Sequence, residues 1–279
     1  MNEKTKARKL IEASLMIAIA TVLSLLKLLD LPFGGSVTLA SMLPLVIIAC
    51  RNGVGWGLAS GAVYGAIQQL LGLKTLSYVT SWYSILAVIL LDYIFAFTVI
   101  GFSGAFRNKC KKQNTAFAVG SLFGCVLRYV FHVLSGATVW AGLSIPTKTA
   151  LFYSLAYNAT YMIPETIVLV VVAYYIGSLL DFRADRPVRL VREATGGGGA
   201  YKFIGWLLIA GAAVFDVICV FGKLQNAETG EFDFSGISAL TRGEIVAMIC
   251  VTAGAVLAAC ALFVIAAKKR KAAAAPSEE

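Results

Sequence analysis

The stretch Ser84-Ile-Leu-Ala-Val-Ile-Leu-Leu-Asp92-Tyr93-Ile-Phe-Ala96 decides the fold, because it is an apolar run that one carboxylate interrupts. It lies within a longer apolar segment, residues 82–106, which exceeds the roughly 20 residues that a helix needs to cross a bilayer. An ionisable group in such a segment is costly, so it normally faces a polar cavity or a partner inside the protein. The stretch therefore predicts a membrane helix that presents Asp92 to the interior of a bundle.

The composition places the whole chain in the same class. Of its 279 residues, 59% are hydrophobic and 14% are charged, and the mean hydropathy is +0.81, which no ordinary soluble domain reaches. Open strands cannot cross lipid, and the apolar runs are solid where a barrel would alternate. We therefore predict an all-α, polytopic helical membrane protein with a six-helix core and two extra C-terminal transmembrane helices. The eight candidate helices are residues 10–29, 37–50, 54–72, 82–106, 115–137, 149–177, 202–222 and 244–267.

The loops predict the orientation, because short cytoplasmic loops carry an excess of Lys and Arg. With eight helices and an inner N-terminus, all four basic clusters fall on the inner side: Arg51, residues 107–112, residues 183–192 and residues 268–271. The last outer loop, residues 223–243, is acidic instead. We predict a multi-pass plasma-membrane protein with both termini in the cytoplasm. The net charge of +9 then reflects topology and anionic lipid contact, and we do not expect nucleic-acid binding.

A composition shift predicts the domain organisation, because a run of four glycines, Gly196 to Gly199, follows a basic stretch. Residues 1–182 are the expected six-helix substrate-binding membrane core, and residues 183–199 are a basic, Gly-rich cytoplasmic linker. Residues 200–267 form a two-helix transmembrane appendage, and residues 268–279 a basic, disordered tail.

A second polar group lies in the segment Cys125-Val-Leu-Arg128-Tyr129-Val-Phe-His132-Val-Leu-Ser135, where Arg128 and the chain's only histidine are one helical turn apart. Trp140, Tyr153 and Asn158 follow closely. Together with Asp92, these side chains predict a site for a small polar molecule inside the membrane.

Structural roles are open for the same residues. Asp92 would also fit a buried bridge to Arg128, and His132 a helix–helix hydrogen bond. Trp140 and Tyr153 would also fit the aromatic belts at the membrane interface. Two further acidic groups have no assigned role. Glu165 follows Pro164 within an apolar run and is expected at a kink facing the interior, and Asp216 in the appendage has no evident partner.

Several functional classes lack the required residues. The six cysteines, at 50, 110, 125, 219, 250 and 260, form no CxxC pair and are expected to be apolar fillers. With a single histidine, neither a metal site nor a cofactor is predicted. The sequence has no Gly-x-x-x-x-Gly-Lys-Ser/Thr phosphate loop, so any ATP-driven step must come from other chains.

Small residues recur at every fourth position in two predicted helices, which allows close approach of the backbones. They are Gly53, Gly57, Gly61 and Gly65 in the third helix, and Ser14 and Ala18 in the first. We expect internal packing for the third helix, and either packing or the docking of a partner for the first.

Residues 8 to 182 resemble the thiamine-specific substrate-binding subunit, or S component, of energy-coupling factor (ECF) vitamin transporters. Three regions carry the resemblance by their order and spacing. The first is Gly35-Ser-Val-Thr-Leu-Ala-Ser-Met-Leu-Pro44 with Arg51-Asn-Gly53. The second is Leu91-Asp92-Tyr93 with Gly101 to Arg107. The third is Arg128-Tyr-Val-Phe-His132 with Gly136 and Trp140, then Tyr153-Ser-Leu-Ala-Tyr157-Asn158.

The resemblance implies high-affinity thiamine binding at an outward-facing intramembrane pocket and no enzymatic activity. The implied partners are an ECF transmembrane coupling protein and two cytoplasmic ATPase subunits. The implied ligand-binding residues are Asp92, Tyr93, His132, Trp140, Tyr153 and Asn158. The chain departs from the family at two places: Asp92 stands where Glu is frequent, and the first outer loop reads Pro32-Phe33-Gly34-Gly35 where a Trp is frequent.

The residue chemistry also fits thiamine, because its cationic thiazolium and its aminopyrimidine require a carboxylate, aromatic faces and hydrogen-bonding partners. Three alternatives stay open at this point. The first alternative is that the ligand is another vitamin or a thiamine precursor such as the pyrimidine half. The second is that the protein is an intramembrane enzyme that uses Asp92, His132 and Glu165 as acid and base. The third is that it is a stand-alone secondary transporter, although it lacks the inverted hydropathy repeat of many such folds.

Overall fold

The computed structural model describes residues 3–30, 35–141, 150–190, 198–224 and 234–272. The predicted residues outside these ranges include Pro32 to Gly34, residues 191–197 of the Gly-rich linker, the acidic positions 228, 231 and 233, and the end of the tail. The long elements are α1 (Glu3–Leu25), α2 (Leu43–Asn52), α3 (Val54–Leu71), α6 (Gln113–Thr138), α7 (Ala150–Leu179), α8 (Gly199–Leu224) and α9 (Arg242–Ala272). Between α3 and α6 lie η1 (Leu73–Tyr78), α4 (Trp82–Val88), η2 (Ile89–Phe95), α5 (Ala96–Thr98) and η3 (Val99–Phe106).

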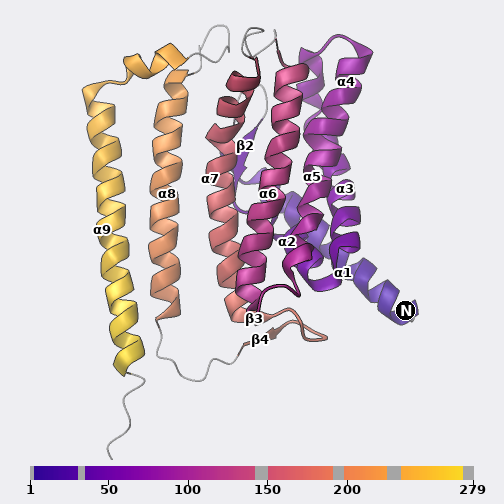
Figure 1. Ribbon diagram of the computed structural model, residues 1–279, viewed down its shortest axis with the longest axis vertical. Coiled ribbons are helices and arrows are strands. Elements are labelled where there is room, and N and C mark those ends of the chain that lie inside the picture. The colour runs from indigo at the N-terminus through magenta and orange to yellow at the C-terminus, as the bar shows by residue number, and fades with distance from the viewer. Residues whose placement is uncertain (1–2, 31–34, 142–149, 191–197, 225–233, 273–279) are drawn as a thin grey trace, which may run out of the picture.

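The helices lie side by side along the long axis of the molecule, with α8 and α9 at one flank (Figure 1). Within the described residues, five helices are long and apolar enough to cross a membrane. They are the continuous span Trp82–Phe106, which comprises α4, η2, α5 and η3, and the helices α6, α7, α8 and α9. The predicted all-α membrane fold is therefore confirmed.

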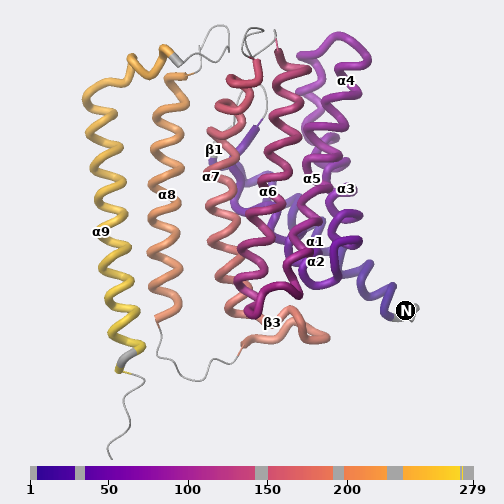
Figure 2. The backbone as a smooth tube through the Cα atoms, viewed as in Figure 1, coloured from indigo at the N-terminus to yellow at the C-terminus, as the bar shows by residue number. Residues whose placement is uncertain are grey.

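The first two predicted helices differ from the structure. The first ends at Leu25, and β1 (Lys27–Asp30) follows it and pairs antiparallel with β2 (Ser36–Thr38). The predicted span at residues 37–50 is wrong, because its start belongs to β2 and α2 has ten residues. Ten residues rise about 15 Å, half the thickness of the hydrocarbon core. Irregular backbone is tolerated at this depth where protein surrounds it, and β2 contacts α7 within the bundle (Figures 1 and 2).

The short helix α2 forms the centre of the core. Its residues Pro44 to Ala49 are all buried, and Leu45 and Val46 pack in the same cluster as Phe97, Ile100 and Leu169 from the surrounding elements. Proline suits the first helical turn, where its missing N–H would be unpaired. Gly53, with φ of +99°, makes the sharp turn from α2 into α3.

The glycine stripe on α3 is internal packing, as predicted. A Cβ atom built on Gly61 would lie 2.4 Å from the carbonyl oxygen of Phe97, and one on Gly57 would lie 2.8 Å from Cα of Gly101. The missing side chains therefore let α3 lie directly against the backbone of the span Trp82–Phe106, which carries Asp92.

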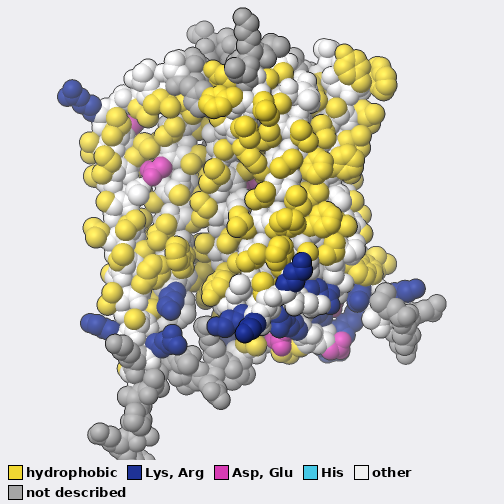
Figure 3. Space-filling model, in the orientation of Figure 1, with side chains coloured by type: hydrophobic (Ala, Val, Ile, Leu, Met, Phe, Trp, Pro, Cys, Tyr) yellow, Lys and Arg dark blue, Asp and Glu magenta, His cyan; other side chains and the backbone are white. Residues whose placement is uncertain are grey.

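Most of the Lys and Arg side chains on the face that Figure 3 shows gather at one end of the molecule, below a band of hydrophobic side chains. Here Arg51 donates to Glu12 on α1 at 2.9 Å and to the carbonyl oxygens of Phe182 and Ala184, both at 2.8 Å. The hydrogen bond from Arg8 lowers the pKa of the Asp185 carboxyl at the same end. This clustering agrees with the pattern that the loops predict, and the assignment of this end to the cytoplasm stays a prediction.

The helix α8 packs against α7 through two aromatic contacts, and α9 packs against α8. The rings of Tyr175 and Phe203 stack at 3.8 Å, and those of Tyr157 and Phe221 meet edge to face at 6.0 Å. Asp216 does have a partner, because it accepts a hydrogen bond from Thr252 on α9 at 2.6 Å. All six cysteines are free thiols.

Candidate functional site

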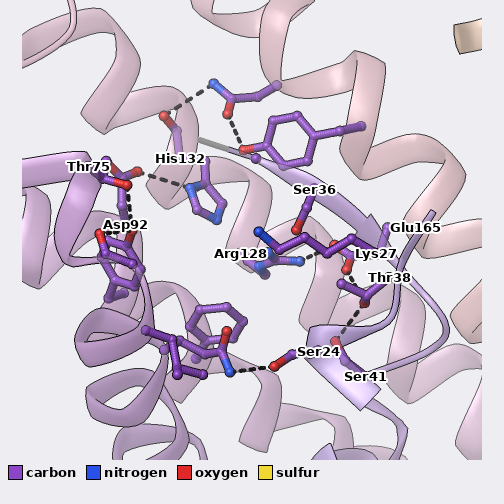
Figure 4. A pocket seen from close by; sticks show the side chains of 18 of the residues that line it. Ser24, Lys27, Ser36, Thr38, Ser41, Thr75, Asp92, Arg128, His132 and Glu165 are labelled. Atoms are coloured by element: carbon purple, nitrogen blue, oxygen red, sulfur yellow. Dashed lines mark hydrogen bonds and ion pairs between the residues drawn. The ribbon is translucent and has the colours of Figure 1, made fainter. Parts of the chain in front are cut away.

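A cavity of about 570 Å³ lies inside the bundle, a volume in the range of small-molecule sites. The end of α1, the β1–β2 hairpin, α3, η1, the span Trp82–Phe106, α6 and α7 all contribute to its walls. Five of the six predicted ligand-binding residues line it: Asp92, Tyr93, His132, Trp140 and Asn158. Side chains from separate parts of the sequence converge here (Figure 4).

Asp92 lies on η2, a π-helical turn of residues Ile89–Phe95. Such widened turns are frequent at functional sites. Its Oδ1 lies 2.9 Å from Nδ1 of His132, and its Oδ2 accepts from Ser135 Oγ at 2.6 Å and from Trp140 Nε1 at 3.1 Å. His132 and Ser135 share one face of α6 because they are three residues apart. These contacts fix the position of the carboxylate. The alternative ion pair between Asp92 and Arg128 is wrong, because Arg128 pairs with Glu165 instead.

His132 has one free ring nitrogen. Its Nδ1 is occupied by Asp92, whereas Nε2 is buried and has no hydrogen-bond partner among the described residues. The imidazole lies between Asp92 and Arg128 (Figure 4). A carboxylate on one nitrogen orients the ring and sets the role of the other. Within the described part of the chain, Nε2 is therefore an unpaired polar atom in a side chain that lines the cavity.

A second polar cluster forms another part of the wall. Arg128 donates to Oε2 of Glu165 at 2.5 Å, and Oε1 of Glu165 accepts from Thr38 on β2 at 2.8 Å. The guanidinium also lies 4.8 Å from the centre of the Phe97 ring. Both charged side chains are buried, with 6% and 2% of their surface exposed. The sequence singled out Arg128 and Glu165 as intramembrane charges, and their opposite signs were the signal that could have paired them.

Asn158 joins α7 to α6. Its Nδ2 donates to the carbonyl oxygens of Ser154 at 2.9 Å and His132 at 3.3 Å, and its Oδ1 accepts from the Tyr161 hydroxyl at 2.6 Å. The amide nitrogen is therefore occupied by protein, while Oδ1 retains one acceptor site.

Aromatic rings form much of the remaining wall. The Tyr93 hydroxyl donates to Thr75 Oγ1 at 3.1 Å, and the ring centres of Tyr78 and Trp140 lie 6.5 Å apart. Tyr153 is the predicted residue that does not line the cavity. It packs behind it, against the cluster of Val79, Val88 and Trp140.

The charges of Asp92, Arg128 and Glu165 in the cavity wall sum to one negative charge. Arg128 and Glu165 cancel, so Asp92 supplies one uncompensated negative charge when His132 is neutral. Lys27 and Lys74 also line the cavity, but both are exposed, and water screens their charge. The interior therefore favours a cationic group. Among the described residues, no three His, Cys, Asp or Glu side chains group in a way that would hold a metal ion.

Fold and site together define a multi-pass α-helical membrane protein with a ligand-sized polar cavity inside its bundle. The family described as "Thiamine transporter protein (Thia_YuaJ)" matches residues 10–181, so the chain belongs to this family. This confirms the resemblance inferred from the sequence over residues 8 to 182.

A curated relative supports this assignment, and a solved structure shares the fold. The chain is 34% identical over 183 residues to the thiamine transporter ThiT of Bacillus subtilis (strain 168), and the alignment covers 62% of this chain and 91% of that protein. Its fold matches a solved structure of ThiT from Listeria monocytogenes with a TM-score of 0.52 and 24% identity, over 62% of this chain and 94% of that chain. The family match ends before α8 begins.

Proposed function

We propose that the chain binds thiamine in the cavity and acts as the substrate-specificity subunit of an ATP-driven ECF vitamin transporter. The observation that carries this proposal is the half-buried Asp92 carboxylate, which contacts with His132, Ser135 and Trp140 fix in a cavity of about 570 Å³. Membership of the thiamine transporter family supports it.

The chemistry of the wall suits the two halves of thiamine. The cationic thiazolium gains from the negative charge of Asp92 and from an aromatic face such as Trp140. The aminopyrimidine has both donors and acceptors, and it can use His132 Nε2 and the remaining acceptor site of Asn158 Oδ1. One cavity thus holds both a site for a cation and hydrogen-bonding groups for the pyrimidine.

Calorimetric titration of thiamine into the purified chain tests the ligand. We expect one site with a dissociation constant below micromolar, and weaker binding of the uncharged pyrimidine half. Tight binding of the pyrimidine half with weak binding of thiamine would instead assign the site to a precursor. Mass spectrometry of the released ligand then tests for an enzyme, because our proposal requires that thiamine is recovered intact.

The direction of transport follows from the two ends of the molecule. The basic loops lie at one end, which we assign to the cytoplasm of a plasma-membrane protein by the positive-inside rule. The cavity then opens toward the outside, since η1 and the outer end of α6 line it.

The expected docking surface for the ECF coupling protein is the face of α1 that carries Ser14 and Ala18, both of which are exposed beside Leu15. Ala18→Trp should abolish thiamine uptake in cells that also express the coupling protein and the two ATPases, while the purified variant still binds thiamine. Ala258→Trp, at an exposed position of α9, is the matched control and should leave uptake unchanged. Uptake that continues without the ATPases would contradict the ECF assignment and favour a stand-alone transporter.

A further inference from the structure

The helix α8 lies outside the family match, yet it contacts the wall of the cavity. Phe221 and Leu224, near its end, are buried in one cluster with Val37 of β2 and with Tyr157 and Tyr161 of α7. Both tyrosines line the cavity. The helix therefore forms a second layer behind the residues that face the ligand.

The contact continues inward through a series of rings. Phe221 lies 6.0 Å from Tyr157 between ring centres, Tyr157 lies 6.2 Å from Tyr161, and Tyr161 lies 6.1 Å from His132. All three contacts are edge to face, an arrangement that aromatic pairs favour. We call Phe221, Tyr157, Tyr161 and His132 the aromatic row. It connects α8 with His132, which lines the cavity.

Contacts with Asn158 and Gly35 fix the position of Tyr161. Its hydroxyl donates to Asn158 at 2.6 Å, and Gly35 of the hairpin lies so close to the ring that a Cβ there would be 2.7 Å from Tyr161 Cε1. Gly35 has a φ of +89°, which favours glycine. A shift of Tyr157 away from its place would therefore change the position of Tyr161, and with it the Asn158 oxygen and the His132 ring.

We propose that α8 buttresses the ligand cavity, and that Phe221 is a positioning residue which holds His132 and Asn158 in their binding geometry through the aromatic row. This assigns a function to a helix that the six-helix core lacks. The inference deepens the proposed function and rests on it for the identity of the ligand.

The loss of the Phe221 ring leaves space beside Tyr157, and this part of α7 then gains freedom. Coupling through packed side chains of this kind changes affinity by about threefold to thirtyfold. We expect weaker binding mainly through faster dissociation, because the polar groups that contact the ligand are all retained.

The chain offers a matched control on the same helix pair. Phe203 stacks on Tyr175 of α7, as Phe221 packs on Tyr157, but it lies 18 positions earlier, which is about 27 Å along α8. Phe203→Ala removes an aromatic contact between α7 and α8 at the end away from the cavity. Phe221→Leu keeps an apolar side chain and guards against simple misfolding of Phe221→Ala.

The experiment measures thiamine affinity, dissociation rate and thermal stability for the full-length parent and the three variants. We expect Phe221→Ala to weaken binding by about tenfold, Phe221→Leu by less, and Phe203→Ala by less than about twofold at a similar loss of stability. Equal effects of Phe221→Ala and Phe203→Ala, or no effect of either, would overturn the proposal.

Hydrogen–deuterium exchange without ligand separates this inference from the ligand assignment. Phe221→Ala should accelerate exchange in residues 154–162 of α7, whereas Phe203→Ala should not. If the parent does not bind thiamine, the proposed function fails, and the exchange data still decide whether α8 supports the cavity. Unchanged exchange in Phe221→Ala would refute the support in either case.

Discussion

Replacement of Asp92 by Asn removes the charge from the cavity and nearly preserves its shape. The new amide oxygen can still accept from Ser135 and Trp140, which now lie 2.6 and 3.1 Å from Asp92 Oδ2. The new amide nitrogen faces His132 Nδ1, which can accept once its proton moves to Nε2. The variant therefore tests charge with the hydrogen-bond network largely intact.

The expected effect follows from the position of Trp140. A cation stacked on the indole, whose nitrogen is 3.1 Å from Asp92 Oδ2, lies roughly 5.5 Å from the carboxylate. At an effective dielectric constant of about 20, two unit charges at this distance attract by about 3 kcal/mol, or about two orders of magnitude in affinity. Water at the open side of the cavity reduces this value, so we expect thiamine to bind about tenfold to a hundredfold more weakly.

Calorimetry with two ligands measures the charge effect directly. The uncharged pyrimidine half should lose less affinity than thiamine in Asp92→Asn, because it has no cation for the carboxylate to attract and is affected only by the change of His132 Nε2 from acceptor to donor. Ser135→Ala is the control variant, since it removes one hydrogen bond to Asp92 and keeps the charge. If Asp92→Asn weakens both ligands by the same factor, the carboxylate only organises the wall, and our electrostatic reasoning is wrong.

Three further predictions concern the wall and the core. Trp140→Ala should weaken thiamine binding by about threefold to thirtyfold, and Trp140→Phe by less, in the same titration; equal losses would exclude the ring as the contact. Glu165→Gln should lower the free energy of unfolding by about 3–5 kcal/mol, because it leaves Arg128 buried without its counter-charge. The double variant Arg128→Met/Glu165→Met should recover most of this loss, and a double variant as unstable as Glu165→Gln would contradict the prediction. Gly61→Ala should lower the free energy of unfolding by about 1–3 kcal/mol in a thermal unfolding assay, since its Cβ would lie 2.4 Å from the Phe97 carbonyl oxygen. Gly55→Ala, with open space around the new Cβ, should leave the stability unchanged.

The sequence predicted the long helices because apolar length is a local property. The runs that became α6, α7, α8 and α9 needed no tertiary information. The predicted membrane helix at residues 37–50 was wrong, because hydropathy does not distinguish a buried strand followed by a short helix from a single membrane helix.

The site was predictable in its members and less so in its pairings. Asp92 and His132 stood out because ionisable groups are rare in apolar segments. The choice of partner depends on how α6 and α7 rotate against each other, so Arg128 pairs with Glu165 and not with Asp92. The same rotation places Tyr153 behind Trp140, outside the lining, although the family resemblance implied that Tyr153 binds the ligand.

A variant that retains Trp140 as its only tryptophan tests the central claim most directly, with Trp56, Trp82 and Trp206 all changed to Phe. Trp140 borders the cavity beside Asp92, so thiamine bound there must change its fluorescence. We predict a saturable change at one thiamine per chain, whose midpoint moves to about tenfold to hundredfold higher thiamine concentration when Asp92→Asn is added. A folded variant that binds thiamine in calorimetry while its Trp140 signal stays constant would place the ligand elsewhere and contradict the account.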